Sequence, residues 1–505
     1  MSEFELVVGL SPVPVTGVAG PELVRPPESV GAYTLVAHVI ADGFTVRAGE
    51  AWRLLLEVTT ANPYPITTLH LTAAAQDVAV HARTIQVLYS VDGHTMGIAA
   101  RSIAVVQPST PTLAATAASQ PPPSVAAPPL AAPPSPADQL QLVPDGDAPD
   151  LTVRITAAAD GRLAWTFESG FADIDVPDAP IVDVVVGEPE HFANDIATKV
   201  SQHEGKPGLY QHLRGIGVEI TEAVPDELWS LLQLVAERAH AAGRLPTVLL
   251  LSAEPFVPWE LAVVDHPWRA DLPPFLGAQA TVGRWVLRRH RPMIPPPRRH
   301  VIGRVAVVWG VYERQGWSRL YAAEDEAAAL LASLPSPTVS AQSVDATLAA
   351  VIDCLQGTPA VDAIHFAVHG TYDPAAGNEG LVLIDGQLLD PMTVQGTELS
   401  GAPFVYLNAC QSGSGSVALS AYSGIAAAFL AAGACAVIAP LWKIGDNDAA
   451  DLAEAFYPAM FAGRPPAEVV REQRAGFVND PDTSTATMLA YQFFGNPTLR
   501  VERAS

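Results

Sequence analysis

The stretches AIHFAVHG (residues 363–370) and PFVYLNACQSG (residues 403–413) decide the fold of this chain of 505 residues. Each begins with a short, continuous apolar run, which is typical of a strand that is buried on both faces of a parallel sheet. Further strands are expected at residues 247–252 and 301–309. Helical stretches alternate with such strands, for example at residues 322–334, 346–355 and 447–461. This alternation predicts an α/β fold with a mostly parallel sheet flanked by helices.

A histidine and a cysteine stand at the ends of these two strands. His369 ends the first and is followed by Gly370, and Cys410 ends the second. Because the carboxyl ends of parallel strands meet at one edge of a sheet, we expect the two side chains to lie within hydrogen-bond reach. An imidazole beside a thiol favours the reactive thiolate and can later protonate a leaving amine. The amides of Gly370 and Cys410 are expected to hold the oxyanion.

The other histidine and cysteine residues of this region have a simpler interpretation. Taken singly, a buried cysteine is most often a small apolar residue, and a histidine in an α/β protein is most often a structural polar group. His365 lies in the middle of its strand, Cys354 in a helical pattern and Cys435 in an apolar run. We expect all three to be structural.

Two acidic residues open the helix that follows the last core strand. Asp446 and Asp448 could line a pocket that favours an Arg or Lys side chain of a substrate. Alternatively, one or both stabilise the N-terminus of their own helix. Asp373 and Glu379, in the loop after His369, are further candidates for such a pocket.

The sequence before residue 301 predicts three further parts. Residues 1–106 contain short alternating strands, such as YTLVAHVIA (33–41), with turn signals between them, which indicate a β-sandwich. Residues 107–140 are a linker rich in proline and alanine. Residues 141–300 form a first α/β lobe, and residues 301–505 form the lobe that carries His369 and Cys410. We expect the β-sandwich to bind a protein partner.

Composition excludes several classes of protein. The chain has 28 Lys and Arg against 53 Asp and Glu, a net charge of −25, so we expect no broad binding to nucleic acid. Its three cysteines form no disulfide framework and no CxxC pair, and no motif for a metal or cofactor is present. The apolar run at residues 423–442 is divided by Gly433 and Pro440, so it predicts a buried helix and strand. We expect a cytoplasmic protein without a membrane span.

Several further motifs occur in an order that resembles CHAT-domain proteins, which are bacterial, caspase-like and separase-like cysteine peptidases. The resemblance extends from about residue 149 to residue 501 and is carried by PDLTVRI (149–155), LAWTF (163–167), VPWELAVVD (257–265), PFLGAQATVGRWVL (274–287), HFAVHG (365–370), LVLIDGQLL (381–389), FVYLNACQSG (404–413), GIAAAFLAAGACAVIAPLW (424–442), residues 446–457 and FFGNPTLR (493–500). One departure is Val368, where many relatives have cysteine. Its position in the alternating strand faces away from the expected site.

The resemblance implies a fold, an activity and a site. The first lobe would be a degenerate caspase-like unit, and the second would use Cys410 as nucleophile and His369 as general base, with Gly370 and Cys410 as the oxyanion hole. The implied function is an intracellular cysteine endopeptidase, regulated and acting in bacterial defence or signalling, with a protein or peptide substrate. A catalytically inactive interaction scaffold and another acyl-transfer or hydrolase activity of the same dyad are the alternatives.

Overall fold

The computed structural model describes most of the chain and divides it into two compact units. The described residues are 3–13, 15–19, 22–24, 32–41, 43–74, 80–106, 139–141, 148–158, 162–182, 188–287, 295–313, 317–373, 378–410, 419–478 and 485–504. The smaller unit contains residues 1–148, 178–180 and 288–295, and the larger contains residues 149–177, 181–287 and 296–505. The predicted linker at 107–140 lies outside the described residues, apart from its last two positions.

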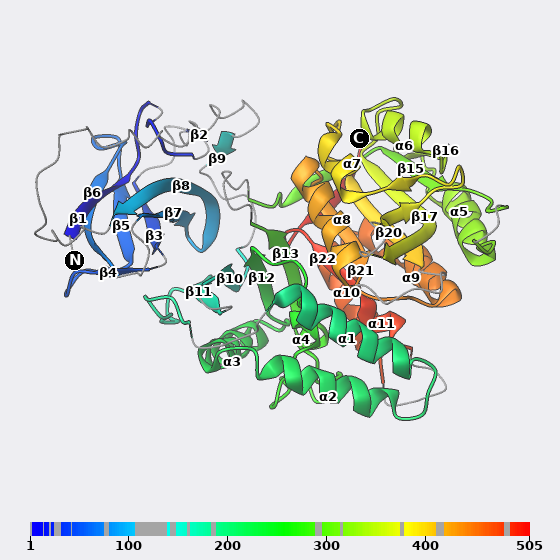
Figure 1. Ribbon diagram of the computed structural model, residues 1–505, viewed down its shortest axis with the longest axis horizontal. Helices are drawn as coiled ribbons and strands as arrows, with labels where there is room; N and C mark the ends of the chain where they lie inside the picture. The colour runs from blue at the N-terminus through cyan, green and yellow to red at the C-terminus, as the bar shows by residue number, and fades with distance from the viewer. Residues whose placement is uncertain are drawn as a thin grey trace, which may run out of the picture. The chain divides into compact units, whose positions relative to one another are not determined.

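The smaller unit is a β-sandwich (Figure 1, blue). Its four-stranded sheet has the order β5 (Arg53–Val58), β3 (Tyr33–Ala41), β7 (Val80–Val91) and β8 (His94–Val106). Its three-stranded sheet has the order β1 (Glu3–Gly9), β6 (Ile66–Ala73) and β4 (Phe44–Val46). Leu35 and Val39 of the first sheet share one core with Leu69 and Leu71 of the second. The predicted sandwich is therefore confirmed. A separate pair joins β2 (Glu22–Val24) to β9 (Gln139–Gln141).

The larger unit is built on one sheet of 12 strands, counted over the described residues. Along its main path the order is β11, β10, β12, β13, β22, β21, β20, β17, β15, β16, and β18 and β19 extend from β17. The bounds are β10 (Leu151–Ala157), β11 (Leu163–Ser169), β12 (Thr247–Ser252), β13 (Thr281–Val286), β15 (Arg304–Trp309), β16 (Ser340–Asp345), β17 (Ala363–Asp373), β18 (Asn378–Val382), β19 (Leu388–Leu389), β20 (Phe404–Cys410), β21 (Ala436–Pro440) and β22 (Tyr491–Phe494).

Most neighbouring strands of this sheet run parallel, as predicted. The series β16, β15, β17, β20, β21 is parallel throughout, and so is the series β10, β12, β13. Strand β22 lies between β13 and β21 and joins the two series (Figure 1). The predicted boundary between residues 300 and 301 therefore lies inside this unit, and the strands on its two sides share one sheet.

Helices cover the sheet on both sides. They are α1 (Pro189–His203), α2 (Leu209–Thr221), α3 (Asp226–Ala241), the 3₁₀ helix η3 (Trp259–Leu261), α4 (Leu276–Gln279), α5 (Tyr321–Ser333), α6 (Leu348–Leu355), α7 (Pro391–Gly396), α8 (Leu419–Ala432), α9 (Asp446–Phe461), α10 (Pro466–Ala475) and α11 (Thr487–Ala490). None of the described helices combines the length and apolar character that crossing a bilayer requires. A separate pair joins β14 (Arg299–Ile302) to β23 (Arg500–Arg503).

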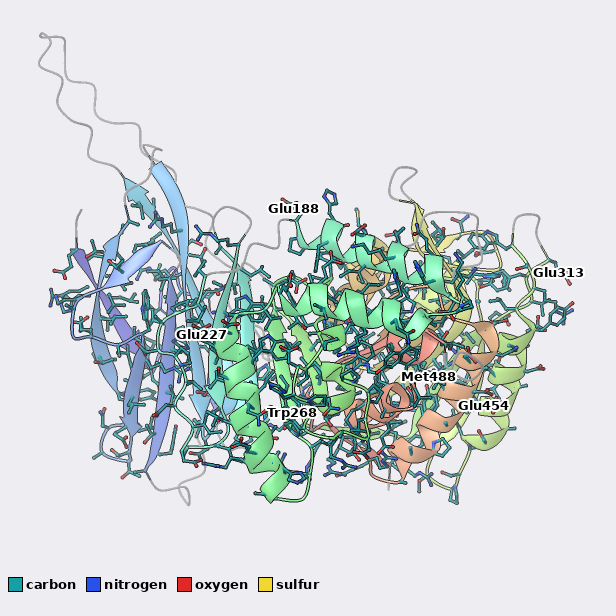
Figure 2. All side chains as sticks on the ribbon, turned by 90° about the horizontal axis from the view of Figure 1, so that it is seen from below. Glu188, Glu227, Trp268, Glu313, Glu454 and Met488 are labelled. Carbon is teal, nitrogen blue, oxygen red and sulfur yellow. The ribbon has the colours of Figure 1, made fainter. Side chains whose placement is uncertain are left out.

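The two faces of the parallel core contact different helices. Phe366 and Val368 of β17 pack in one core with residues of α6, α7 and α8. Ala363 of β17 and Tyr406 of β20 belong to the other core, which contains residues of α5 and α9. On α9, Tyr457 is buried while Glu454 lies on the outer, exposed side (Figure 2). Positions 363, 365, 367 and 369 of β17 therefore lie on the face covered by α5 and α9.

Several element boundaries differ from the sequence prediction. Strand character was expected from residue 301 to 309 without interruption, but Gly303 separates β14 from β15. The carboxylate of Asp362 accepts hydrogen bonds from the Gly303 and Arg304 amides, which holds the chain where it changes sheets. The helix expected from residue 346 begins at Leu348, because the Thr347 side chain caps it by accepting from the Ala350 amide.

Candidate active site

The two residues predicted to form a dyad occupy paired positions on neighbouring strands. In the parallel pair of β17 and β20, His369 lies opposite Cys410, at the last position of the register. Beyond this point β17 leaves the parallel sheet and pairs with β18 in antiparallel fashion, from His369 to Asp373. The dyad positions therefore stand at the carboxyl edge of the parallel core, where open α/β sheets form their binding sites.

The residues around this pair are only partly described. The side chain of Cys410 and residues 411–418 lie outside the described part of the chain. Gly370 is buried and pairs with Leu381 of β18. The side chains of Asp373 and Glu379, which the sequence offered as pocket candidates, also lie outside it.

The His369 imidazole is held by a backbone carbonyl. Its Nε2 atom lies 2.7 Å from the carbonyl oxygen of Ser318, and the His369 residue is fully buried. A carbonyl oxygen only accepts, so Nε2 carries a proton and Nδ1 is the nitrogen that can act as a base. Sequence reasoning missed Ser318, because any residue type can present a carbonyl.

Two aromatic residues pack against the same imidazole. The Tyr312 ring meets it edge-on, with 4.5 Å between ring centroids, and the Trp317 ring lies tilted at 5.1 Å. The Tyr312 hydroxyl accepts a hydrogen bond from the His369 amide at 3.2 Å and donates one to the Val382 carbonyl at 2.6 Å. It thus bridges β17 and β18 where they separate from the parallel sheet. Burial raises the pKa of Tyr312, so the hydroxyl keeps its proton.

Asp446 lies near the imidazole, at the N-terminus of α9. Burial raises the pKa of this half-buried carboxyl, while the charge of His369 and a hydrogen bond from the Ala322 amide oppose the rise. The carboxylate of Asp446 therefore reaches the first turn of α5 rather than capping its own helix. The N-cap of α9 is Gly445, which has no side-chain cap, and its amide donates to the Thr487 hydroxyl at 2.8 Å.

Asp448 faces different surroundings from those of Asp446. It lies near Glu204, whose pKa is raised by burial and, to a smaller extent, by the charge of Asp448. Its side chain also approaches Gly445, since a Cβ atom at that glycine would lie 2.9 Å from an Asp448 carboxylate oxygen. Of the two predicted pocket residues, Asp446 is the one with an electrostatic interaction with His369.

The residues interpreted as structural are buried in the core. Cys354 and Cys435 are 1% and 5% exposed, and burial raises the pKa of both thiols, to about 11 for Cys354. Val368 packs in the core on the face opposite His369, as the strand alternation predicted. His365 is fully buried and pairs with Glu326, which the sequence gave no reason to single out. No group of metal-ligating side chains is found among the described residues.

The solved structures with a similar fold include a separase and a gingipain. The separase of Saccharomyces cerevisiae in complex with securin matches with a TM-score of 0.37 at 12% identity, over 70% of this chain and 30% of that chain. A second crystal structure of that complex matches with a TM-score of 0.32 at 14% identity, over 55% of this chain and 18% of that chain. This chain thus matches well under half of the separase chain.

The second of these proteins is a gingipain. The Arg-specific cysteine proteinase gingipain R matches with a TM-score of 0.35 at 14% identity, over 62% of this chain and 77% of that chain. The complex of the pro- and mature domains of Porphyromonas gingivalis RgpB matches with a TM-score of 0.34 at 12% identity, over 63% of this chain and 79% of that chain. At such low identities and TM-scores, these similarities assign no role to any residue.

Comparison by sequence is more specific. A search of the curated proteins found no match. The family model of the CHAT domain, however, matches residues 173–496, which is more than half of the chain and includes both His369 and Cys410. This agrees with the resemblance that the motifs carry. The chain belongs to the CHAT domain family.

Proposed function

We propose that this protein is a cysteine endopeptidase in which Cys410 is the nucleophile and His369 the general base. The observation that carries the proposal is the register, which sets these two residues opposite each other at the carboxyl edge of the sheet. In the first step the Cys410 sulfur attacks the carbonyl carbon of a peptide bond, and its proton passes to Nδ1 of His369. The tetrahedral oxyanion is held by the amides of Gly370 and Cys410.

The second half of the reaction uses the same groups. The His369 imidazolium protonates the leaving amine as the carbon–nitrogen bond breaks, which leaves a thioester on Cys410. A water molecule, deprotonated by His369, then hydrolyses the thioester and releases the acid product. The Ser318 carbonyl supports both steps, because its hydrogen bond to Nε2 keeps the imidazole in one tautomer and becomes charge-assisted when the ring is protonated.

The proposed specificity is for Arg or Lys before the cleaved bond. Asp446 supports it, because this carboxylate interacts with His369 and so lies close to the reacting groups. A cationic side chain would relieve the unfavourable burial of this carboxylate. Asp448 is the second residue of the proposed pocket.

We also propose a biological setting, which rests on the family resemblance. The enzyme would act in the cytoplasm, on protein or peptide substrates, in a regulated bacterial defence or signalling system. The β-sandwich of residues 1–106 would bind a protein partner, the linker of 107–140 would separate it from the lobes of 141–300 and 301–505, and neither nucleic acid nor a membrane would take part.

The experiment uses a peptide electrophile that reacts with thiols and carries Arg. It is added to the wild type, Cys410→Ala and His369→Ala, and the site of labelling is located by mass spectrometry. We expect labelling at Cys410 in the wild type, none in Cys410→Ala and a strong decrease in His369→Ala. Cys435→Ala is the matched control, because this buried thiol should not contribute. A wild type that neither labels nor cleaves peptides would overturn the proposal in favour of the scaffold.

The specificity has its own test. Asp446→Asn is compared with the wild type on fluorogenic peptides with Arg, Lys or Gln before the cleaved bond. We expect kcat/KM for Arg and Lys to fall at least about tenfold more than for Gln, since a hydrogen bond between charged groups contributes roughly 1.5–3 kcal/mol. Equal losses for all three peptides would contradict a pocket made by Asp446.

A further inference from the structure

A buried polar network lies beneath the candidate site and serves no step of the proposed reaction. It consists of Glu326 on α5, His365 on β17, Asn408 on β20, Tyr457 on α9 and Tyr491 on β22. None of these five residues is more than 5% exposed. Apolar residues of similar volume are often as stabilising as a buried polar network or more so, and a satisfied network can instead specify a unique geometry.

Each hydrogen-bonding group of the Asn408 side chain has a partner. Its amide nitrogen lies 2.7 and 2.8 Å from the two carboxylate oxygens of Glu326 and 3.2 Å from the Ala449 carbonyl oxygen. Its amide oxygen accepts from the Tyr491 hydroxyl at 2.5 Å. The reversed amide would place oxygen against the carboxylate, so only one orientation of this side chain satisfies all partners.

His365 completes the network from the neighbouring strand. Its Nε2 lies 2.7 Å from a carboxylate oxygen of Glu326, and its Nδ1 lies 3.0 Å from the Tyr457 hydroxyl. The Glu326 carboxylate thus joins β17 to β20 through side chains, in addition to the backbone ladder between these strands. Helix α5, which supplies Glu326, begins at Tyr321, shortly after Ser318, whose carbonyl holds His369.

The strand register relates this network to the dyad. On β17 and β20 the successive pairs of alternate positions are His365 with Tyr406, Ala367 with Asn408, and His369 with Cys410. Two residues along a strand span about 7 Å. Asn408 therefore lies two residues before the proposed nucleophile on the same face of the sheet. His365 lies four residues before the proposed base on that face.

We propose that Asn408 and Glu326 are positioning residues. They fix the ends of β20 and β17 relative to each other, so that the Cys410 and His369 side chains meet in the geometry that the reaction requires. The inference rests on the proposed peptidase function. Misplacement of a catalytic group by about 1 Å can lower a rate by about 100-fold, so a network this close to the dyad has a large effect on catalysis. The Glu326–Asn408 contact is the central link, because it connects both dyad strands with α5.

Three substitutions test the proposal with graded severity. Asn408→Leu removes the link and should lower kcat about 30-fold with little change in KM. Tyr491→Phe removes only the donor to the Asn408 oxygen and should lower kcat about threefold to tenfold. Tyr457→Phe removes a hydrogen bond to His365, which lies further from the dyad than Asn408. It should therefore lower kcat less than Tyr491→Phe. If Asn408→Leu fails to fold, the milder Tyr491→Phe decides.

A conservative variant should restore most of the function. In Glu326→Gln the new amide oxygen can accept from Asn408, and its nitrogen can donate to Nε2 of a His365 that carries its proton on Nδ1 and donates to Tyr457. Asn408 and His365 keep their partners, and the Tyr457 hydroxyl changes from donor to acceptor, so kcat should stay within about threefold of the wild type. In Glu326→Leu these bonds are lost, and kcat should fall as in Asn408→Leu.

The second readout is the pH dependence of Cys410 alkylation by iodoacetamide, followed by mass spectrometry of the Cys410 peptide. Pairing with His369 should place the wild-type midpoint below the ordinary thiol pKa of about 8.5. Asn408→Leu should shift the midpoint upward, because the dyad is less well aligned. A merely structural role would lower the melting temperature but leave the midpoint unchanged.

Glu254→Leu is the matched control. This buried glutamate follows β12, accepts hydrogen bonds from the amides of Phe256 and Val257 and from the Trp259 indole, and lies away from the dyad along the sheet. Its substitution should lower the melting temperature without moving kcat or the alkylation midpoint. If Asn408→Leu and Tyr491→Phe behave like this control, the positioning role is overturned while the dyad stands. If His369→Ala leaves the wild-type midpoint unchanged, the proposed function itself fails, and the inference with it.

Discussion

At the scale of single residues, the chemistry of the site depends on how His369 is held. The Ser318 carbonyl fixes the tautomer, and the Tyr312 hydroxyl fixes the backbone by bridging the His369 amide and the Val382 carbonyl. Both contacts come from the segment between β15 and α5. The imidazole thus depends on a segment that is remote in sequence from the strand that carries it.

Tyr312→Phe should lower kcat about tenfold and leave KM nearly unchanged, since a lost bridge shifts the base without removing a substrate contact. Steady-state kinetics on an Arg-containing peptide measure this effect. Tyr321→Phe is the control, because Tyr321 belongs to the same region of the chain and is 66% exposed. Equal kcat values for Tyr312→Phe and the wild type would contradict the bridging role.

Asp446 allows a second prediction at this scale, on stability and pH. Its folded-state pKa is raised, mainly by burial, so the charged form opposes folding at neutral pH. This cost is present above the folded-state pKa and disappears as pH falls below the ordinary Asp value of about 3.9. Asp446→Asn should therefore melt at the same temperature as the wild type or higher at pH 7, and any advantage should shrink at acidic pH.

Thermal melting at pH 7 and pH 4 measures this behaviour. Asp451→Asn, an exposed position on the same helix, should show no such dependence. A lower melting temperature of Asp446→Asn at pH 7 would mean that the carboxylate stabilises the fold. The combination of lower activity and unchanged or higher stability is typical of a group retained for function.

At the scale of elements, local capping determines where helices of the second lobe begin. The Asp390 carboxylate accepts from the Thr393 amide at 2.8 Å and from its hydroxyl at 2.9 Å, and Pro391 occupies the first turn of α7. This is the arrangement that a helix N-terminus favours. Helix α7 packs its buried Val394 in the core that covers β17 and β20.

Asp390→Ala should lower the free energy of unfolding by about 1 kcal/mol, because the amide and the hydroxyl of Thr393 lose their acceptor. Urea denaturation followed by fluorescence gives this value. Glu398→Ala, at an exposed acidic position just after α7, is the control and should be neutral. An unchanged midpoint in Asp390→Ala would show that the core alone determines the start of the helix.

At the scale of the larger unit, a buried ion pair supports the joint between the two parallel series of strands. Glu260 pairs with Arg284 of β13, and Gln492 of β22 donates to the same carboxylate at 2.9 Å. Burial alone would raise the pKa of Glu260, but the charge and hydrogen bonds of Arg284 outweigh it and lower the pKa. The pair thus stabilises the fold in its charged form.

Glu260→Gln should lower the free energy of unfolding by about 3–5 kcal/mol, since it leaves Arg284 buried without its counter-ion. The loss should be complete above the ordinary Glu pKa of about 4.3 and should fade as pH drops through the lower folded-state value. Denaturation at pH 7 and at a series of lower pH values, extending well below 4, measures both effects. Asp271→Asn, in an exposed pair with Arg269, should change neither midpoint, and a similar result for Glu260→Gln would contradict the argument.

The sequence by itself determined many of the strands, the α/β class and the location of His369 and Cys410 at the ends of two strands. Alternating and continuous apolar runs are local signals, so β3 at residues 33–41 and β12 at residues 247–252 were predicted with their observed bounds. The polar strand β16 (SAQSVD) was missed, because an edge strand needs little apolar character. Helix α2 and strand β13 were also not singled out.

Only the tertiary structure decided how distant parts of the chain meet. The Ser318 carbonyl has no sequence signature, and Glu326 looks like any acidic residue of a helix until His365 and Asn408 are seen beside it. The insertion of β22 between β13 and β21 depends in the same way on contacts between segments far apart in sequence. Local patterns follow from the preferences of neighbouring residues, whereas such contacts follow from the packing of the whole unit, which no short stretch of sequence encodes.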